Sequence, residues 1–410
     1  MTAETPSLPL RSTHAAEARV LTSVSAAHFA SHFYFLLLPP LFIWVRADYG
    51  VSYTELGFAI AVFNIVSALF QTPAGFLADR VGPYLVLVAG LALEAVAFGL
   101  VGVVHSFWFL VAMFGVAGLA NTVFHPADYA LLSHHIGKER VGRAFSIHTF
   151  AGMLGGAVAP ATMLFLQSVV GWRGAFVAAA AGGLAVALAL VVLRGDFAHG
   201  PHIAARAKAQ DGESPDNWKL LTSGPILRSF AFFTMLAAGS VGIQNYSVVA
   251  LHDLFGTTPE IANTALTATL SMTALGVLVG GFLVTRIGNH GLFAAIGIGL
   301  WGLAILGVGI ADFGTAVLML MMGIGGFASG VIMPSRDMIV REVTPPGSFG
   351  TVFGFVTTGF NVAGVLFPVV FGALMDHGSP RAVFFVAAAC SLLAIATVVT
   401  VRKKRSRIAG

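Results

Sequence analysis

The stretch GFLADRVG at residues 75–82 occurs a second time, with changes, as GFLVTRIG at residues 281–288. The two copies begin 206 residues apart, and each joins the end of a long apolar segment to the start of the next. A repeat whose period is about half the chain indicates two halves of similar fold, not an array of small units. Further matches, 208 or 209 residues apart, extend the repeat: GRAF at 142–145 with GTVF at 350–353, Pro160 with Pro368, and FVAAA at 176–180 with FVAAA at 385–389.

The composition is that of an integral membrane protein. Of the 410 residues, 57% are hydrophobic and only 10% are charged, whereas soluble domains carry about 25% charged residues. The net charge of +4 is explained by membrane topology, so a lipid bilayer and not nucleic acid is the expected partner. The single cysteine, Cys390, excludes a disulfide within the chain and a cluster of thiolate metal ligands.

Apolar segments of about 20 residues, the length that spans a bilayer, predict an all-α protein with twelve transmembrane helices. We expect these helices near residues 20–45, 53–78, 84–104, 107–133, 145–168, 174–193, 228–252, 261–284, 291–311, 314–338, 351–375 and 382–401. The predicted organisation is a tail (1–19), an N-terminal six-helix bundle (20–193), a polar linker (194–227), a C-terminal six-helix bundle (228–401) and a basic tail (402–410).

The basic residues are distributed asymmetrically about these spans. With the N-terminus in the cytoplasm, 18 of the 22 lysines and arginines fall on the cytoplasmic side. The opposite side holds only Arg46, Arg173 and Arg381, and Arg336 lies within a span. Because cytoplasmic loops carry an excess of Lys and Arg, this distribution predicts that both termini are cytoplasmic.

Twelve spans in two similar halves, a central linker and the loop at 75–82 together resemble the major facilitator superfamily of secondary transporters. In that family, the loop between the second and third spans reads roughly G-x-L-a-D-r-x-G, and this chain matches it at Gly75, Leu77, Asp79, Arg80 and Gly82. The resemblance implies two pseudo-symmetric six-helix bundles, alternating access, a functional monomer, no cofactor and a place in the inner (plasma) membrane.

The same resemblance implies that this loop is a cytoplasmic gate between the halves. Its residues Gly75, Asp79, Arg80 and Gly82 are therefore candidate gating residues, together with Arg286 of the second copy, where Thr285 replaces the acid. The alternative is that the charged residues only cap and orient a helix end.

A shorter stretch, NTVFHPAD at residues 121–128, is similar to fosmidomycin-resistance-type bacterial carriers, which have a Phe-His-Pro in a comparable place.

Ionisable residues inside a membrane are costly and mark function, and the family resemblance implies that the first, fourth, seventh and tenth spans line the solute cavity. On the first span, His28 and His32 are four residues apart and share one helix face. They either bind an anionic solute or hydrogen-bond to the backbone of a neighbouring helix. Two histidines could also ligate a metal ion, but no third ligand is close in the sequence, so we expect no metal site.

On the fourth span, Asn121, His125 and Asp128 recur at i, i+4 and i+7 and are expected on one face. Asn121 is a candidate for solute binding. A buried carboxylate without a counter-charge takes up a proton, which makes Asp128 the candidate proton carrier and His125 its relay. The alternative is a static ion pair with Arg336. Glu94, midway along the third span, is either a further proton-coupling residue or an interhelical hydrogen-bonding residue.

On the tenth span, Arg336 lies 208 residues after Asp128 and so at the pseudo-symmetric position. A guanidinium group binds anions bidentately, which makes Arg336 the candidate anion anchor, held by Asp128 when no solute is bound. The alternative is that the neighbouring Asp337 neutralises it. On the seventh span, the consecutive residues Gln244, Asn245 and Tyr246 are candidates for solute binding, but they point in different directions, so only one or two are expected in the cavity.

These residues predict a transporter that moves a small organic anion, a carboxylate or phosphonate, by alternating access coupled to protons. Two alternatives stay open: an antiporter that exports amphipathic drugs against protons, and a membrane-embedded enzyme with His125 and Asp128 as an acid–base pair. The sequence has no G-x-x-x-x-G-K-[ST] motif, so ATP is not the expected energy source. The repeat, without an evident nucleophile or metal cluster, argues against an enzyme.

Overall fold

The computed structural model describes residues 14–137, 139–197, 217–345 and 348–399. The predicted tails and linker therefore fall partly or wholly outside the described residues. The first half contains α1 (His14–Phe35), η1 (Pro39–Leu41), α2 (Phe42–Tyr49), α3 (Tyr53–Val81), α4 (Pro83–Val103), α5 (Phe107–Asn121), α6 (Phe124–His135), α7 (Val141–Val192) and η2 (Arg194–Phe197). The second half contains α8 (Asn217–Leu221), α9 (Gly224–Phe255), α10 (Pro259–Leu283), η3 (Val284–Arg286), α11 (His290–Ile310), α12 (Thr315–Val331), α13 (Met333–Val343), α14 (Phe349–Asp376) and α15 (Pro380–Val399).

Every regular element in the described ranges is a helix, which confirms the predicted fold class. Eleven helical segments of these ranges are long and apolar enough to cross a membrane. One of them, α7, has 52 residues and contains Gly171 at a φ of 73°, a non-helical value that separates two spans. Counting α7 as two spans gives the twelve that the sequence predicts.

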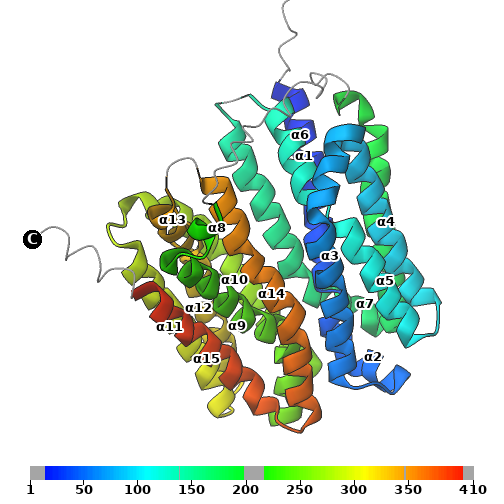
Figure 1. The fold of residues 1–410 in the computed structure, drawn as a ribbon. Helices are drawn as coiled ribbons and strands as arrows, with labels where there is room; N and C mark the ends of the chain where they lie inside the picture. The colour runs from blue at the N-terminus through cyan, green and yellow to red at the C-terminus, as the bar shows by residue number, and fades with distance from the viewer. Residues whose placement is uncertain (1–13, 138, 198–216, 346–347, 400–410) are drawn as a thin grey trace, which may run out of the picture.

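The two halves form two bundles that stand side by side (Figure 1). They meet mainly through two helix pairs, α3 with α14 and α7 with α10, and through a smaller contact of η1 with α9. We call the end of the molecule where α2 lies, between α1 and α3, the α2 end. The end where α1 begins, and where α7 and α9 meet the linker, is the linker end. These two names are used below because the structure itself contains no membrane.

Two helices that the sequence predicts as continuous are broken. The fourth span, predicted over 107–133, is divided into α5 and α6 at Thr122 and Val123, and the tenth, predicted over 314–338, is divided into α12 and α13 at Ile332. A proline follows each break within the first turn of the next helix, Pro126 in α6 and Pro334 in α13. Proline has no backbone N–H and its ring crowds the preceding turn, so a break at this place has a local cause in both halves.

Glycines allow the closest helix contacts, and they do so symmetrically. A Cβ atom on Gly118 of α5 would overlap the backbone of Phe63 on α3, and one on Gly326 of α12 would overlap the backbone of Thr269 on α10. The two glycines are 208 residues apart, as in the sequence repeat. Small residues at helix interfaces let backbones approach closely inside a membrane, which fixes the position of the broken fourth and tenth spans.

We expect Gly118→Ala to destabilise the protein by about 1–3 kcal/mol, the usual cost of overpacking a tight contact. The thermal unfolding temperature of the purified protein in detergent measures this loss. The matched control is Gly182→Ala on α7, where a Cβ atom would meet no atom within 4 Å. The control should be neutral or slightly stabilising, because alanine favours a helix over glycine by up to about 1 kcal/mol. Equal unfolding temperatures for the two variants would contradict this packing argument.

Candidate functional site

A cavity of about 390 Å³ lies between the two halves. Helices α1, α3, α4, α5 and α7 line it from one side, and α9, α10, α12, α13 and α14 from the other. The wall is mainly apolar, and its polar side chains include His32 and Asn64 from the first half and Gln244, Asn245 and Arg336 from the second. A cavity of this size, with few polar groups, suits a small organic molecule.

Arg336 projects from α13 into this cavity. Its Nε donates a hydrogen bond of 2.9 Å to Oδ1 of Asp337, and its guanidinium carbon lies 4.6 Å and 5.3 Å from the ring centres of Phe233 and Phe360. In the described part of the chain, the two Nη atoms have no hydrogen-bond partner. The structure thus pairs Arg336 with its neighbour on one edge, as one of the two sequence hypotheses predicts, and leaves the other edge for a ligand.

Asp128 lies elsewhere, in a buried cluster inside the first half. Its Oδ2 is 3.2 Å from Nδ1 of His28 and 3.4 Å from Nε2 of His148, and the Asp128 side chain is 0% exposed. The rings of His28 and His148 stack with their centres 3.9 Å apart. Among the described residues, no lysine or arginine pairs with Asp128, so the structure does not bring Asp128 and Arg336 together in this conformation.

Two further histidines lie beside this cluster, and one of them connects it to the cavity. The ring centre of His28 is 4.6 Å from that of His32 and 5.5 Å from that of His125. His32 also lines the cavity. Gly152 of α7 lies against the rings of His28 and His32, where a Cβ atom would overlap them. The cluster is therefore separated from the cavity by a single helical turn of α1.

His148 is the residue that the sequence analysis missed. It is 1% exposed and lies near the start of α7, within the span predicted over 145–168. The rule that selected His28, an ionisable residue inside a span, would also have selected His148. His148 belongs to the fifth span, which the family resemblance does not assign to the cavity.

Asn121 and Glu94 pair with one another away from the cavity. Asn121 Nδ2 donates a hydrogen bond of 3.1 Å to Glu94 Oε1, and Glu94 is fully buried on α4. The helix is interrupted directly after Asn121, and Asn121 contacts α4 whereas Asp128 contacts α1 and α7. This geometry corresponds to the interhelical hydrogen bond that was one of the two hypotheses for Glu94.

The three consecutive polar residues of α9 have different surroundings. Gln244 and Asn245 line the cavity. Tyr246 is fully buried, and its hydroxyl lies 2.6 Å from the carbonyl oxygen of Pro368 and 3.3 Å from that of Tyr53. Because Pro368 forms part of the cavity wall, Tyr246 closes the cavity toward the α2 end, and its hydroxyl is occupied by the protein backbone.

A second contact holds the halves together at the α2 end. Asp376, at the end of α14, accepts hydrogen bonds of 2.8 Å from the backbone amides of Tyr53 and Thr54, the first two residues of α3. The amino end of a helix carries a partial positive charge that attracts a carboxylate. Gly372, one turn earlier in α14, leaves no room for a Cβ atom against the same two residues. The helix end and the glycine together bring α3 and α14 into contact.

The predicted gating residues lie at the linker end. Residues 75–81, with Gly75, form the last two turns of α3, and Gly82, at a φ of 102°, ends that helix and precedes α4. Asp79, Arg80 and Arg286 are exposed. Within the described residues, none of these three forms a hydrogen bond or ion pair with the other half. In this conformation, Asp376 and Tyr246 join the halves by hydrogen bonds at the α2 end.

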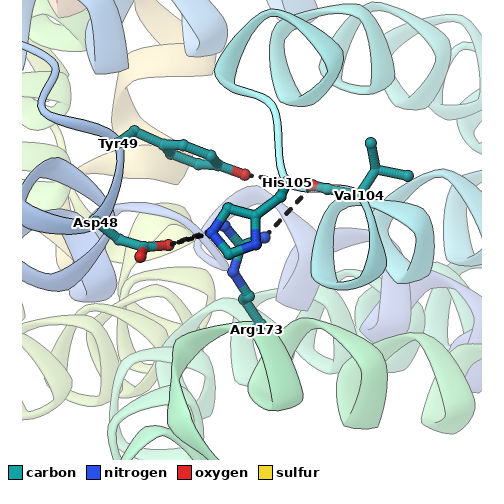
Figure 2. A network of polar contacts seen from close by, with 5 residues as sticks. All are labelled: Asp48, Tyr49, Val104, His105 and Arg173. Atoms are coloured by element: carbon teal, nitrogen blue, oxygen red, sulfur yellow. Dashed lines mark hydrogen bonds and ion pairs between the residues drawn. The ribbon is translucent and has the colours of Figure 1, made fainter.

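The α2 end of the first half is braced by a network around Arg173, shown in Figure 2. Its Nη2 donates a hydrogen bond of 2.8 Å to Oδ2 of Asp48, and its Nη1 contacts the carbonyl oxygen of Val104 at 3.4 Å. His105 Nε2 lies 3.6 Å from the same Asp48 oxygen, and the Tyr49 hydroxyl donates to the Val104 carbonyl at 3.5 Å. The network fixes α2 against the α4–α5 loop and the second span of α7.

The family model described as Major Facilitator Superfamily matches residues 24–249 of this chain and again residues 230–409. The chain is 27% identical over 374 residues to the "Probable sulfoacetate transporter" of Cupriavidus necator, covering 81% of each chain. It is 23% identical over 395 residues to the "Fosmidomycin resistance protein" of Escherichia coli, covering 92% of each, which confirms the weaker similarity noted in the sequence.

Among solved structures, the chain is similar to a bacterial homologue of the human lysosomal transporter Spinster in an inward-facing, unoccupied conformation. The TM-score is 0.77 at 14% identity, and the alignment covers 95% of this chain and 98% of the other. At this identity the likeness concerns the fold alone. It supports the arrangement of two six-helix bundles described above.

We expect Asp376→Asn to weaken the closed contact at the α2 end, because the amide loses the charge that the helix end attracts. The expected loss is about 1 kcal/mol, roughly a fivefold shift in the population of conformations. Spin labels on cysteines introduced at Ala47 and Glu260, in a Cys390→Ser background, would report the distance between halves by double electron–electron resonance.

The matched control for this experiment is Asp312→Asn. Asp312 lies at the same end but bonds only within its own loop, to the amide of Gly314 at 2.8 Å. A longer-distance population that grows for Asp376→Asn and not for Asp312→Asn supports the contact as a gate. Identical distance distributions for both variants and the parent would show that Asp376 does not hold the halves together.

Proposed function

The chain belongs to the major facilitator superfamily and is thus a membrane transporter and not an enzyme, and we propose that it carries a small organic anion by alternating access coupled to protons. The observation that carries this proposal is the placement of Arg336, whose guanidinium group stands at the cavity wall with its Nη edge unpaired within the described residues. An arginine in that position offers two parallel N–H donors to a carboxylate, sulfonate or phosphonate group.

The surroundings of Arg336 favour a ligand of this class. Phe233 and Phe360 hold the guanidinium plane by contacts with their rings, so the donor edge is oriented before the solute arrives, which lowers the entropic cost of binding. Gln244 and Asn245 on the same side of the cavity supply neutral hydrogen-bonding groups for the rest of the molecule. The name of the sulfoacetate relative, which refers to an anion with two acidic groups, is consistent with this substrate class.

For proton coupling we assign the carrier role to Asp128, with His28 and His148 in contact and His32 and His125 as the route to the cavity. A buried carboxylate is expensive unless a cation compensates it, and the described residues provide neither a lysine nor an arginine partner. The cluster therefore has the properties of a site that accepts a proton. The cluster lies in the first half and Arg336 in the second, so the proposed proton site and solute site are on opposite sides of the cavity.

A second candidate function is the export of amphipathic drugs. The cavity wall includes the aromatic side chains of Phe35, Phe63, Phe98, Phe114 and Phe360, and one relative is a fosmidomycin resistance protein. Binding confined to bulky amphipathic compounds, and unaffected by changes at Arg336, would favour this function over the organic-anion carrier.

The proposal includes the place and orientation of the chain. We propose that it lies in the inner (plasma) membrane as a working monomer, with both termini cytoplasmic, because 18 of its 22 basic residues then face the cytoplasm. In that orientation the linker end is cytoplasmic and the contact between Asp376 and α3 lies on the opposite side.

We expect Arg336→Ala to lower affinity for small organic anions by about one to two orders of magnitude, because a hydrogen bond to a charged group contributes about 1.5–3 kcal/mol. A thermal-shift screen of the purified protein against carboxylates, sulfonates including sulfoacetate, and phosphonates measures this, since a ligand that binds the folded state raises its unfolding temperature. The control is Arg228→Ala, a half-buried arginine that bonds only within its own helix, to the Gly224 carbonyl at 3.1 Å. Anion binding that survives in Arg336→Ala would refute the anchor.

We expect Asp128→Asn to abolish accumulation driven by a proton gradient in proteoliposomes while leaving exchange of solute across the membrane. The amide has nearly the same shape as the carboxyl group, but it cannot take up and release a proton. Glu94→Gln is the comparison, because Glu94 is the other fully buried carboxylate considered for coupling. If gradient-driven accumulation persists in Asp128→Asn and is lost in Glu94→Gln, the coupling residue is Glu94.

A further inference from the structure

Two histidines lie on α1 without a third metal ligand close in the sequence, and the fold brings further ligands to His28. Asp128 comes from α6 and His148 from α7, and one ligand atom from each of His28, Asp128 and His148 lies within 4.8 Å of the others. All three residues are buried, at 4%, 0% and 1% exposure. We infer that these three side chains form a binding site for a divalent transition-metal ion of the Zn²⁺ type.

Two of the three distances between ligand atoms in this cluster correspond to those in a site for one metal ion, and the third is no more than 4.8 Å. In a tetrahedral Zn²⁺ site, bonds of about 2.0–2.1 Å place neighbouring ligand atoms about 3.3–3.4 Å apart. Asp128 Oδ2 lies 3.2 Å from His28 Nδ1 and 3.4 Å from His148 Nε2. Small movements of the side chains would bring all three to bonding distance of one ion. Two imidazoles and a carboxylate suit Zn²⁺, Co²⁺ or Ni²⁺, whereas Mg²⁺ and Ca²⁺ prefer oxygen ligands.

The hydrogen bonding of the cluster is incomplete. Both carboxylate oxygens of Asp128, Nδ1 of His28 and both ring nitrogens of His148 are buried without a hydrogen bond to the described residues, because the contacts lack the required alignment. Buried polar atoms are nearly always satisfied in proteins, and each one left unsatisfied costs stability. A metal ion would satisfy one atom from each of the three residues at once, and its charge would compensate the carboxylate.

The cluster also has a route of entry. An ion in the cavity first meets His32 on the wall, whose ring centre is 4.6 Å from that of His28. His125 lies nearby, 5.5 Å from His28 between ring centres, but outside the set of three ligands. The bound ion would join α1, α6 and α7, and it would compete with protons for Asp128.

The test uses the purified full-length protein in detergent, with an affinity tag that contains no histidine, and the metal ions alone as probes. Tetrahedral Co²⁺ has a characteristic visible absorption, so titration with CoCl₂ reports both occupancy and geometry. We expect one Co²⁺ per chain, displacement of Co²⁺ by Zn²⁺, and a rise in unfolding temperature with either ion. These readouts need neither a solute nor a proton gradient, so their failure is distinguishable from a failure of the proposed transport function.

Variants identify the ligands. We expect His148→Ala and the nearly isosteric Asp128→Asn to lower Co²⁺ affinity at least about tenfold and to abolish the tetrahedral spectrum, because three protein ligands with one open position define such a site. His134→Ala, on the exposed end of the same helix as Asp128, should bind as the parent does. Asp128→Asn preserves the test if His148→Ala does not fold. Absence of a tetrahedral spectrum in the parent, or a spectrum that persists in Asp128→Asn, overturns the site.

Discussion

A carboxylate buried at 0% exposure inside a membrane protein, without a lysine or arginine beside it, is the constraint on which the functional part of this structure depends. Such a group is tolerated only where a cation or proton reaches it or where polar neighbours share its charge. Here the neighbours are His28 and His148, from two further helices. Their arrangement exists because Gly152 lets α7 approach α1 closely enough for the histidine rings to stack.

The two halves of the molecule have the same architecture and carry different chemistry. Both have a broken helix with a proline after the break, and both use a glycine, Gly118 or Gly326, at the tight contact beside it. At the pseudo-symmetric positions after the breaks, one half has Asp128 and the other Arg336. The aspartate faces inward into its own bundle, whereas the arginine faces the shared cavity. One repeated scaffold thus places a buried carboxylate in the first half and a guanidinium group at the cavity wall in the second.

The contact between halves is also asymmetric along the axis of the molecule. At the α2 end, Asp376 binds the amino end of α3, and the Tyr246 hydroxyl meets two backbone carbonyls. In each of these contacts one partner is a backbone group, which is present whatever side chain its residue carries. A helix end and a carboxylate attract each other by less than the cost of unfolding either bundle, so such a contact can open while both bundles remain folded, which alternating access requires.

The sequence by itself determined the fold class, the number of spans and the two-fold repeat, because these follow from hydropathy and from period, which are local properties of the chain. It also marked His28, His32, His125, Asp128 and Arg336, since an ionisable residue inside an apolar span is visible without a structure. It expected Asn121 on the same face as Asp128, whereas the two side chains contact different helices, and it overlooked His148. Which of these residues meet was decided only by the tertiary structure. Contacts such as His148 with Asp128, Asn121 with Glu94 and Asp376 with α3 join segments 20 to 323 residues apart, and their formation depends on how closely glycines let the helices pack, which no local pattern records.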